Sequence, residues 1–275
     1  MYAFGPLPKY KKSGRIIGTH QKIDRIARRH LASHLDDSLV FPRISEILHF
    51  EGSRGPDGVK LKSPGKDEPW HFIDPSDVND TNELFTAIAD HRENLTEALV
   101  AKNHERAAFE AAWLAHAVVD GLTPAHHEPL DEQTEHLKHA DEKKYKVRSK
   151  VIMSGGGSAG QFLANNWDYW GAKGLMTNHT LFEAGIAVAA KPLKFTRATL
   201  SQHDFDSLDA KGFLTVYGSM IKEIASLDMY EQFKQTGWTT RLAQQTTGVL
   251  LPTIVRAVTL AWYDAYTTAL VRRGE

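Results

Sequence analysis

The sequence predicts an all-α fold with a packed core. Helical patterns recur along the chain, whereas runs of alternating β-branched residues, which indicate strands, are nearly absent. The hydrophobic content of 41% is ample for the core of a 275-residue chain. We expect residues 1–275 to form a single domain. Seven segments are predicted to be helical: 18–36, 82–102, 104–120, 128–146, 178–191, 205–225 and 246–272.

Two of these helices have recognisable ends. The pair Asp80–Thr81 can cap the helix at 82–102, because side-chain oxygens at that position accept hydrogen bonds from the free N–H groups of a first turn. Residues 104–120 are rich in Ala, Leu and Glu and contain neither Pro nor Gly, a composition that favours helix. Gly121 and Pro124 are expected to end it.

The last predicted helix, 246–272, is the most apolar segment of the chain. Pro252 starts or kinks it, and Arg256 and Asp264 interrupt its apolar run. A membrane-spanning helix needs about 20 predominantly apolar residues. The segment is therefore predicted to be a buried core helix, and no transmembrane segment is expected.

Two stretches are predicted to be loops. Residues 51–79 hold many of the Gly, Pro and Asp residues, and so long a loop usually has a functional role. The glycine-rich stretch 154–160 lacks the Lys-Ser/Thr pair of a phosphate-binding loop and is expected to be a flexible connection. The aromatic cluster that follows, at 165–170, is expected to pack in the core; the alternatives are that it lines a substrate cleft or touches a lipid surface.

Charge and cysteine content limit the chemistry of the chain. The net charge of -1 provides no steering toward polyanions, which argues against nonspecific nucleic-acid binding. The chain has no cysteine, which excludes disulfides, thiolate metal sites and cysteine nucleophiles. Any zinc site must therefore use nitrogen and oxygen donors.

The stretch from His116 to His126 carries the most specific pattern. His116 and Asp120 are spaced i, i+4, so both side chains lie on one helix face, and His126 follows after a turn. Such His–acid pairs arise about 1.7 times by chance at this composition, whereas the three-residue pattern arises roughly 0.1 times. The pairs present are His20/Asp24, His116/Asp120, His127/Asp131 and His179/Glu183. The three-residue pattern predicts a metal site, since zinc prefers imidazole nitrogen and carboxylate oxygen; a helix-end salt bridge is the alternative.

These three residues, with the sequence Thr-Pro-Ala-His at their end, resemble the central signature of the zinc-dependent phospholipase C family, whose relatives include single-strand-specific zinc nucleases. Other motifs occur in the family's order: Gly18-Thr19-His20, Gly55-Pro56-Asp57-Gly58, Trp70-His71-Phe72 with Asp74-Pro75, and Asn178-His179-Thr180-Leu181-Phe182-Glu183. The similarity spans about residues 18–183. It implies a multi-helix bundle with a metal cleft between helices, on which C-terminal helices at about 190–275 pack.

The resemblance also implies a set of zinc ligands. One ion would be held by Asp57, His71, His116 and Asp120, a second by His126, His179 and Glu183, and a third by His20 and Asp120. Asp67 and Glu68 lie nearer to His71 along the chain and are alternatives to Asp57. Taken alone, His179 and Glu183 also fit an exposed helix pair.

The third zinc site has an incomplete set of ligands. In the family this ion also takes the amino and carbonyl groups of an N-terminal Trp, and this chain has no Trp before Trp70. Two zinc ions are therefore expected, with the third site weak, empty or completed by water. The first residues, MYAFGPLPKYKKSG, lack the apolar stretch of a signal peptide, which predicts a cytoplasmic location, whereas the resemblance implies an extracellular one.

Three functions follow from these observations. The first, implied by the resemblance, is hydrolysis of phospholipid headgroup phosphodiesters by a metal-activated water, with transient contact to a membrane surface and with Asp57 orienting or deprotonating the water. The second is a single-strand nuclease or nucleotidase that uses the same zinc ions and stacks bases on aromatic side chains. The third is a helical protein that zinc stabilises and that does not catalyse a reaction.

Overall fold

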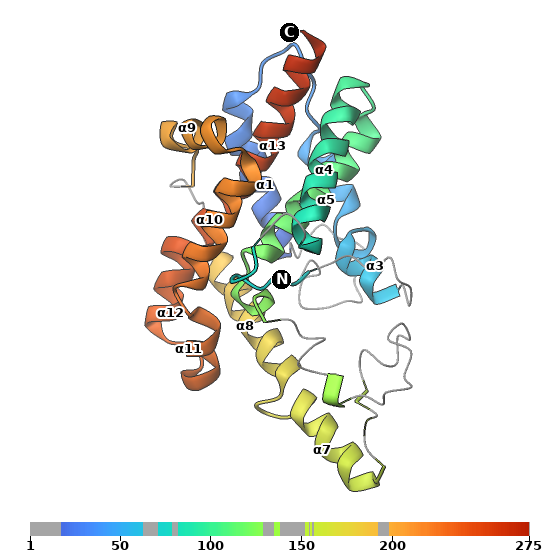
Figure 1. Ribbon diagram of the computed structural model, residues 1–275, viewed down its shortest axis with the longest axis vertical. Coiled ribbons are helices and arrows are strands. Elements are labelled where there is room, and N and C mark those ends of the chain that lie inside the picture. The colour runs from blue at the N-terminus through green and yellow to red at the C-terminus, as the bar shows by residue number, and fades with distance from the viewer. Residues whose placement is uncertain are drawn as a thin grey trace.

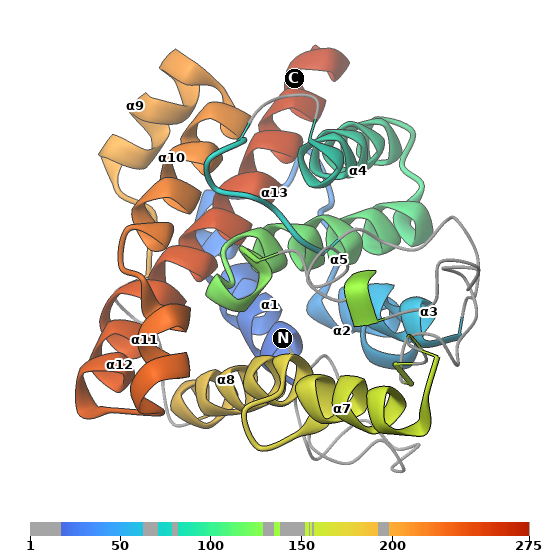
Figure 2. The same ribbon diagram turned by 60° about the horizontal axis from the view of Figure 1, so that its bottom comes forward.

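The protein is a bundle of helices arranged around α5 and α13 (Figures 1 and 2). The computed structural model describes residues 18–62, 71–78, 82–128, 135–137, 152–153, 155, 157–191 and 198–274. Within these residues the regular elements are helices and no strand occurs, so the all-α prediction is confirmed.

The α-helices are α1 (Thr19–Leu31), α2 (Ile44–Ile47), α3 (Pro56–Lys62), α4 (Glu83–Val100), α5 (His104–Gly121), α7 (Ala159–Trp170), α8 (Leu175–Ala190), α9 (Gln202–Lys211), α10 (Phe213–Ala225), α11 (Met229–Thr236), α12 (Thr240–Gln245) and α13 (Leu251–Arg273). Short 3-10 turns lie at Ala32–His34 (η1), Leu48–Phe50 (η2), Gly52–Arg54 (η3), Pro124–His126 (η4) and Glu135–Leu137 (η5), and a π-helical turn at Thr246–Leu250 (η7) leads into α13.

Helix α13 is the apolar centre of the bundle and packs on α1, α4, α5 and α10. Its inward side chains are fully buried, among them Trp262, whose Nε1 donates a hydrogen bond to the Ala111 carbonyl of α5 at 2.9 Å. Pro252 lies in the first turn, where a missing N–H costs little. The prediction of a core helix is confirmed. Among the described residues, none of the helices combines the length and apolarity that crossing a bilayer requires.

Helices α1 and α5 bring polar side chains into this core. On α1 the buried face holds Ile23, Ala27 and Leu31, and His20 and Asp24 lie on the same side. Both polar side chains are fully buried. The helix therefore places ionisable groups where an amphipathic helix normally places apolar ones.

Helix α5 ends where the sequence predicts, at Gly121. A Cβ atom on Gly121 would lie 2.2 Å from Tyr217 Oη, so only glycine lets α10 approach this closely. Tyr217 Oη donates a hydrogen bond to the Val118 carbonyl at 2.9 Å. This contact fixes the end of α5 that carries His116 and Asp120.

Two sequence predictions are wrong in detail, and two others fall mainly or wholly outside the described residues. The helix predicted at 205–225 is two helices, α9 and α10, because Gly212 adopts φ +74° between them. The loop predicted at 51–79 contains η3 and α3. The helix predicted at 128–146 falls largely outside the described residues, of which 135–137 form a 3-10 turn. The predicted cap Asp80–Thr81 lies outside them too, and Asn82 caps α4 by accepting from Leu84 N.

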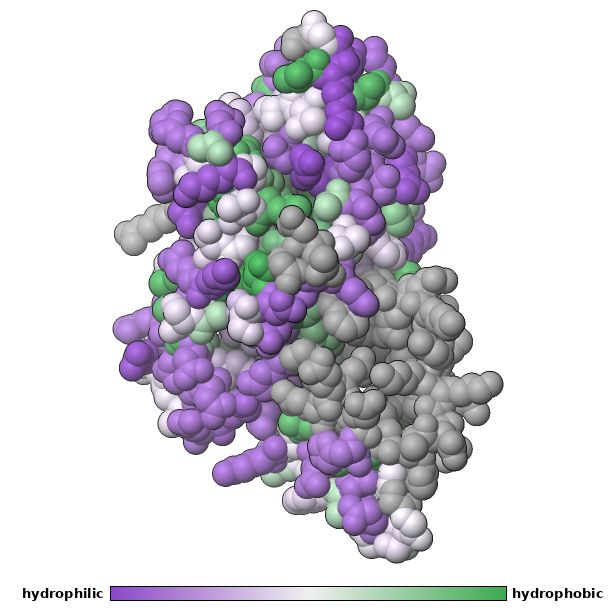
Figure 3. Space-filling model, viewed as in Figure 1, coloured by the Kyte–Doolittle hydropathy of each residue, from purple (hydrophilic) through white to green (hydrophobic). Residues whose placement is uncertain are grey.

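Helix α7 is absent from the predicted elements. Ser158 caps it, and it continues into α8 along one edge of the molecule (Figure 2). We expected the aromatic cluster at 165–170 to pack in the core. Tyr169 is buried as expected, but Trp167 is 68% exposed. Four large apolar side chains of α7 are exposed: Phe162, Leu163, Trp167 and Trp170. By contrast, the side of the bundle formed by α9, α11 and α12 is mainly hydrophilic in the view of Figure 3.

Candidate metal centre

The eight predicted metal ligands lie in the described residues, and the structure brings them together from separate elements. His20 lies at the start of α1, Asp57 in the first turn of α3, His71 in an extended segment, His116 and Asp120 in α5, His126 in η4, and His179 and Glu183 in α8. They form three groups that could hold a metal ion: His20, His116 and Asp120; Asp57, His71 and His116; and His126, His179 and Glu183. Within each group, the donor atoms lie within 4.8 Å of one another.

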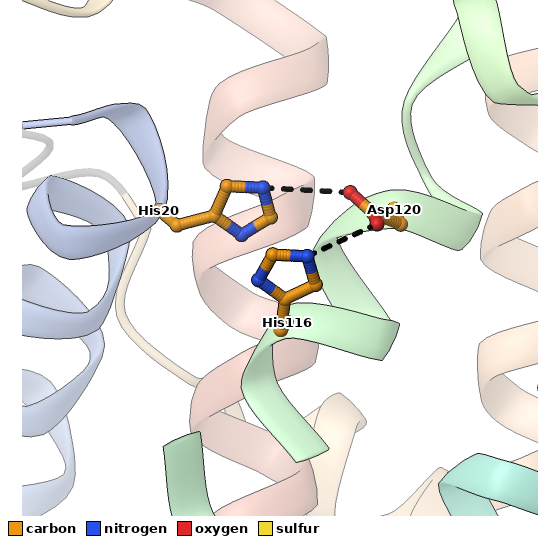
Figure 4. A group of neighbouring side chains, drawn as sticks. All are labelled: His20, His116 and Asp120. Carbon is orange, nitrogen blue, oxygen red and sulfur yellow. Dashed lines mark ion pairs between the residues drawn. The ribbon is translucent and has the colours of Figure 1, made fainter. Parts of the chain in front are cut away.

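Asp120 lies at the centre of these groups and faces four imidazoles. Its Oδ1 is 3.4 Å from His20 Nε2 and 3.5 Å from His126 Nδ1. Its Oδ2 is 3.3 Å from His116 Nε2 and contacts His71 Nδ1. Figure 4 shows His20 reaching from α1 and His116 from α5 toward different oxygens of the carboxylate. One carboxylate can thus serve two neighbouring groups at once.

Asp57 is the ligand that is open to solvent. Its side chain is 25% exposed, whereas the side chains of His116 and Asp120 are at most 2% exposed, and its Oδ1 lies 3.6 Å from His116 Nε2. Opposite it, the segment that carries His71 is held to η4 because Ile73 N donates to the His126 carbonyl at 3.0 Å. The alternatives to Asp57, Asp67 and Glu68, lie outside the described residues.

The third group joins η4 to α8. Glu183 Oε1 lies 3.1 Å from His126 Nε2 and 3.3 Å from His179 Nε2. The rings of His126 and His179 stack, with centroids 5.1 Å apart. His179 and Glu183 are buried rather than an exposed helix pair.

The separations between donor atoms fit a metal ion better than hydrogen bonds. Most of the nitrogen–oxygen distances in the groups are 3.3–3.6 Å, longer than the 2.7–3.2 Å of a hydrogen bond. Two ligands at about 2.1 Å from one tetrahedral ion stand about 3.4 Å apart. The pairs at 3.3–3.6 Å therefore leave room for an ion between their atoms.

Unpaired polar atoms support the same conclusion. Both ring nitrogens of His20 and of His116, and Nδ1 of His126, are buried without a hydrogen-bond partner. Leaving a buried polar atom unpaired costs about 1–3 kcal/mol. So many unpaired nitrogens in one place indicate that the donor set is built for a cation.

The electrostatics keep most of these ligands in their metal-binding state. Burial raises the pKa of the Asp120 carboxyl, but the imidazoles of His126 and His116 hold it well below the ordinary value. Burial would also raise the pKa of Asp57, yet His116 and His71 lower it overall. Burial lowers the pKa of His126 to about 4. At neutral pH both carboxylates are ionised and His126 is neutral.

His116 is the exception. Burial lowers the pKa of its imidazole, but the carboxylates of Asp120 and Asp57 raise it well above the ordinary value. Without an ion, His116 carries a proton at neutral pH, and that proton must leave when a metal binds.

Two buried carboxyls next to these groups were not predicted as site residues. Glu51 Oε1 lies 3.7 Å from His116 Nδ1, on the opposite side of the ring from Asp120. Asp24 follows His20 by one helical turn, and neither of its oxygens has a hydrogen-bond partner. The spacing of His20 and Asp24 was visible as one of four His–acid pairs, whereas no sequence pattern marks Glu51.

A groove of about 510 Å³ lies at the corner between α7 and α8 and contains none of the predicted ligands. It is lined by His136, Leu137, Trp167, Asp168, Lys173, Gly174 and Leu175. Leu175, His179 and Glu183 follow one another at i, i+4 and i+8 along α8, so this end of the groove lies about 6 Å along the helix axis from the third group.

Comparison of the chain with models of known protein families, with curated proteins and with solved structures gives no match. The interpretation therefore rests on the residues and their geometry.

Proposed function

We propose that this chain is a zinc-dependent hydrolase of phosphoric esters, with chemistry like that of phospholipase C. The observation that carries the proposal is Asp120, a buried carboxylate that faces four imidazoles from four separate elements. A carboxylate in this position can bridge adjacent metal ions. Adjacent zinc ions, when bound, lower the pKa of a shared water toward 7 and neutralise phosphate oxygens.

The donor set favours zinc among the common metals. The ligands are imidazoles and carboxylates, and the chain has no cysteine. His71, His116, Asp57 and Asp120 would hold one ion, His126, His179 and Glu183 a second, and His20 with Asp120 a third. The structure adds His116 to the surroundings of His20, since these two residues and Asp120 form one group.

Asp57 has the position and charge of the group that acts on the attacking water. It is the solvent-exposed ligand, and its lowered pKa keeps it ionised at neutral pH. An ionised carboxylate at the mouth of the centre can accept a hydrogen bond from a water, orient its lone pair toward phosphorus and take its proton. The buried ligands, by contrast, only hold their geometry.

The substrate is proposed to be a phospholipid with a headgroup phosphodiester. The outward face of α7 presents Phe162, Leu163, Trp167 and Trp170, and indole rings favour the boundary between headgroups and acyl chains. Helix α7 leads into α8 and packs on it, and α8 carries His179 and Glu183. The apolar face therefore belongs to the same edge of the molecule as these two ligands.

A single-strand nuclease or nucleotidase is the second candidate. Trp167 is 68% exposed and shares the groove with Lys173, so an indole and an ammonium stand together. An indole stacks on nucleobases, and a lysine ammonium pairs with phosphate.

The test compares substrates with the zinc-loaded protein. Phosphatidylcholine vesicles and single-stranded DNA are offered separately, with Asp120→Asn and a chelator-treated sample as controls. We expect release of phosphocholine that both controls abolish. Cleavage of DNA alone would support the second candidate, and full zinc content without turnover of either substrate would support a structural metal.

A further inference from the structure

Glu51 lies behind the metal-facing side of His116. The His116 ring directs Nε2 toward Asp57 and Asp120, at 3.6 and 3.3 Å, and directs Nδ1 toward Glu51 Oε1 at 3.7 Å. His116 Nδ1 and Glu51 Oε1 are both buried, and neither has a hydrogen-bond partner. The distance exceeds an N–H···O hydrogen bond by about 0.7 Å. Each of the two unpaired atoms thus has the other within 4 Å.

The backbone fixes the place of Glu51. It precedes the 3-10 turn η3, and its second carboxylate oxygen accepts from Gly52 N at 3.3 Å. Gly52 adopts φ +66°, a conformation that favours glycine. The turn therefore holds the carboxylate at the base of the site, while Oε1 stays directed at the imidazole.

Asp24 of α1 is a second buried carboxyl near Glu51. It is fully buried, and both of its oxygens are unpaired. Burial, and next the neighbouring Glu51 carboxylate, raise the pKa of Asp24 well above its ordinary value. Two adjacent buried carboxyls resist ionising together.

We propose that Glu51 is a positioning residue for the metal centre: it accepts a hydrogen bond from His116 Nδ1–H, so that the Nε2 lone pair faces the metal ion. This inference rests on the metal centre of the proposed function. An imidazole that binds a metal through one nitrogen needs an acceptor for the N–H of the other, and losing that acceptor weakens metal binding by about 10–100-fold.

The test measures zinc affinity and stoichiometry, not activity. Apoprotein is titrated with zinc against a chromophoric chelator for wild type, Glu51→Gln and Glu51→Met. Gln keeps an uncharged acceptor and Met keeps the length without one. We expect the zinc site that uses His116 to lose affinity by about 10–100-fold in Glu51→Met and by less in Glu51→Gln. At saturating zinc, both variants should still bind the full number of ions. Glu105→Met, at an exposed position of α5, is the matched control and should match wild type.

Thermal unfolding of the apoproteins separates positioning from a structural role. Removing one partner of a buried charged pair can destabilise a fold, so the melting temperature shows how much Glu51 contributes to the apoprotein itself. A Glu51→Met apoprotein that melts no lower than wild type, yet binds zinc more weakly, supports positioning. Melting at a lower temperature together with wild-type zinc affinity would overturn it.

The remaining outcomes are distinct. If the wild-type chain takes up no zinc, the metal centre itself fails. If Glu51→Met binds zinc as tightly as wild type, only the role of Glu51 fails. The loss of one whole equivalent at saturating zinc would make Glu51 a ligand and would also overturn the positioning role.

Discussion

The rings of His20 and His116 stack face to face, with centroids 4.0 Å apart and planes 9° apart. Their Nε2 atoms point to different oxygens of Asp120. Both Nε2 atoms are buried without a hydrogen-bond partner, so each ring could offer its Nε2 lone pair to a metal ion. Adjacent metal ions joined by one carboxylate would use both lone pairs.

His20→Ala should remove one metal equivalent. Of the candidate metal ligands, His20 is the one on α1. Among the described residues, its Nε2 has no hydrogen-bond partner and forms an ion pair with Asp120. Elemental analysis of the dialysed protein should show one zinc fewer than wild type. His30→Ala, on the same helix, is the control, because His30 bonds the Ala198 carbonyl instead. Equal zinc content in His20→Ala and wild type would remove His20 from the site.

Asp120→Asn should cost more metal than Glu183→Gln. Asp120 faces four imidazoles and Glu183 faces two, so the first change weakens two groups and the second weakens one. We expect Asp120→Asn to lose at least one more zinc per chain than Glu183→Gln, measured by elemental analysis. Similar losses in the two variants would mean that Asp120 does not bridge.

Asp57→Asn should reduce turnover more than metal content. The side chain is 25% exposed and partly replaceable as a ligand, but an amide cannot take a proton from water. At saturating zinc, kcat should fall by about 10²–10⁴-fold with little change in KM. Recovery of wild-type kcat at high zinc would show that Asp57 serves only to hold the ion.

Zinc binding at pH 7 should release a proton. The apoprotein His116 has a pKa well above 6.5 and is protonated, whereas His126, with a pKa of about 4, is already neutral. Because a proton competes with the ion at His116, zinc affinity should fall as the pH falls. Calorimetric titration in buffers of different ionisation enthalpy measures the number of protons released. A binding enthalpy that is independent of the buffer would contradict this assignment.

Gly185→Ala should displace α8. A Cβ atom at this position would lie 1.9 Å from Trp238, whose ring stacks on Phe182 at 5.4 Å. Overpacking of this kind typically costs about 1–3 kcal/mol, and here it also moves the helix that carries His179 and Glu183. We expect a lower melting temperature and reduced zinc content. The control is Gly248→Ala, where no atom lies within 4 Å of the added Cβ, so stability should be unchanged or higher.

The elements that the sequence predicts best are those whose formation depends on residues close to one another along the chain. Helix α5 was predicted within one residue, because its composition, its end at Gly121 and its i, i+4 pair all act within a few turns. The break at Gly212 was not predicted, since the helical pattern continues through it and only the positive φ separates α9 from α10. Helix α7 was missed because its large apolar side chains face outward, so no inward apolar stripe marks it.

The same distinction holds for the candidate site. His116, Asp120 and His126 are recognisable from their spacing, and the other five ligands were taken from a family resemblance rather than from geometry. Glu51 could not be found either way, because it meets His116 only through the packing of η2 and α2 on α5. Residues that support a site from behind depend on tertiary contacts, which a single sequence does not show.

The ligands of the three groups are widely separated along the chain, and this determines when they can be completed during synthesis. His20 leaves the ribosome almost a hundred residues before His116, and the group of His126 and Glu183 is incomplete until residue 183 has been made. An ion held by His20, His116 and Asp120 could therefore find its full set of ligands only after α1 has met α5. In a cell short of zinc, newly made copies would accumulate with their helices docked and their imidazoles still empty.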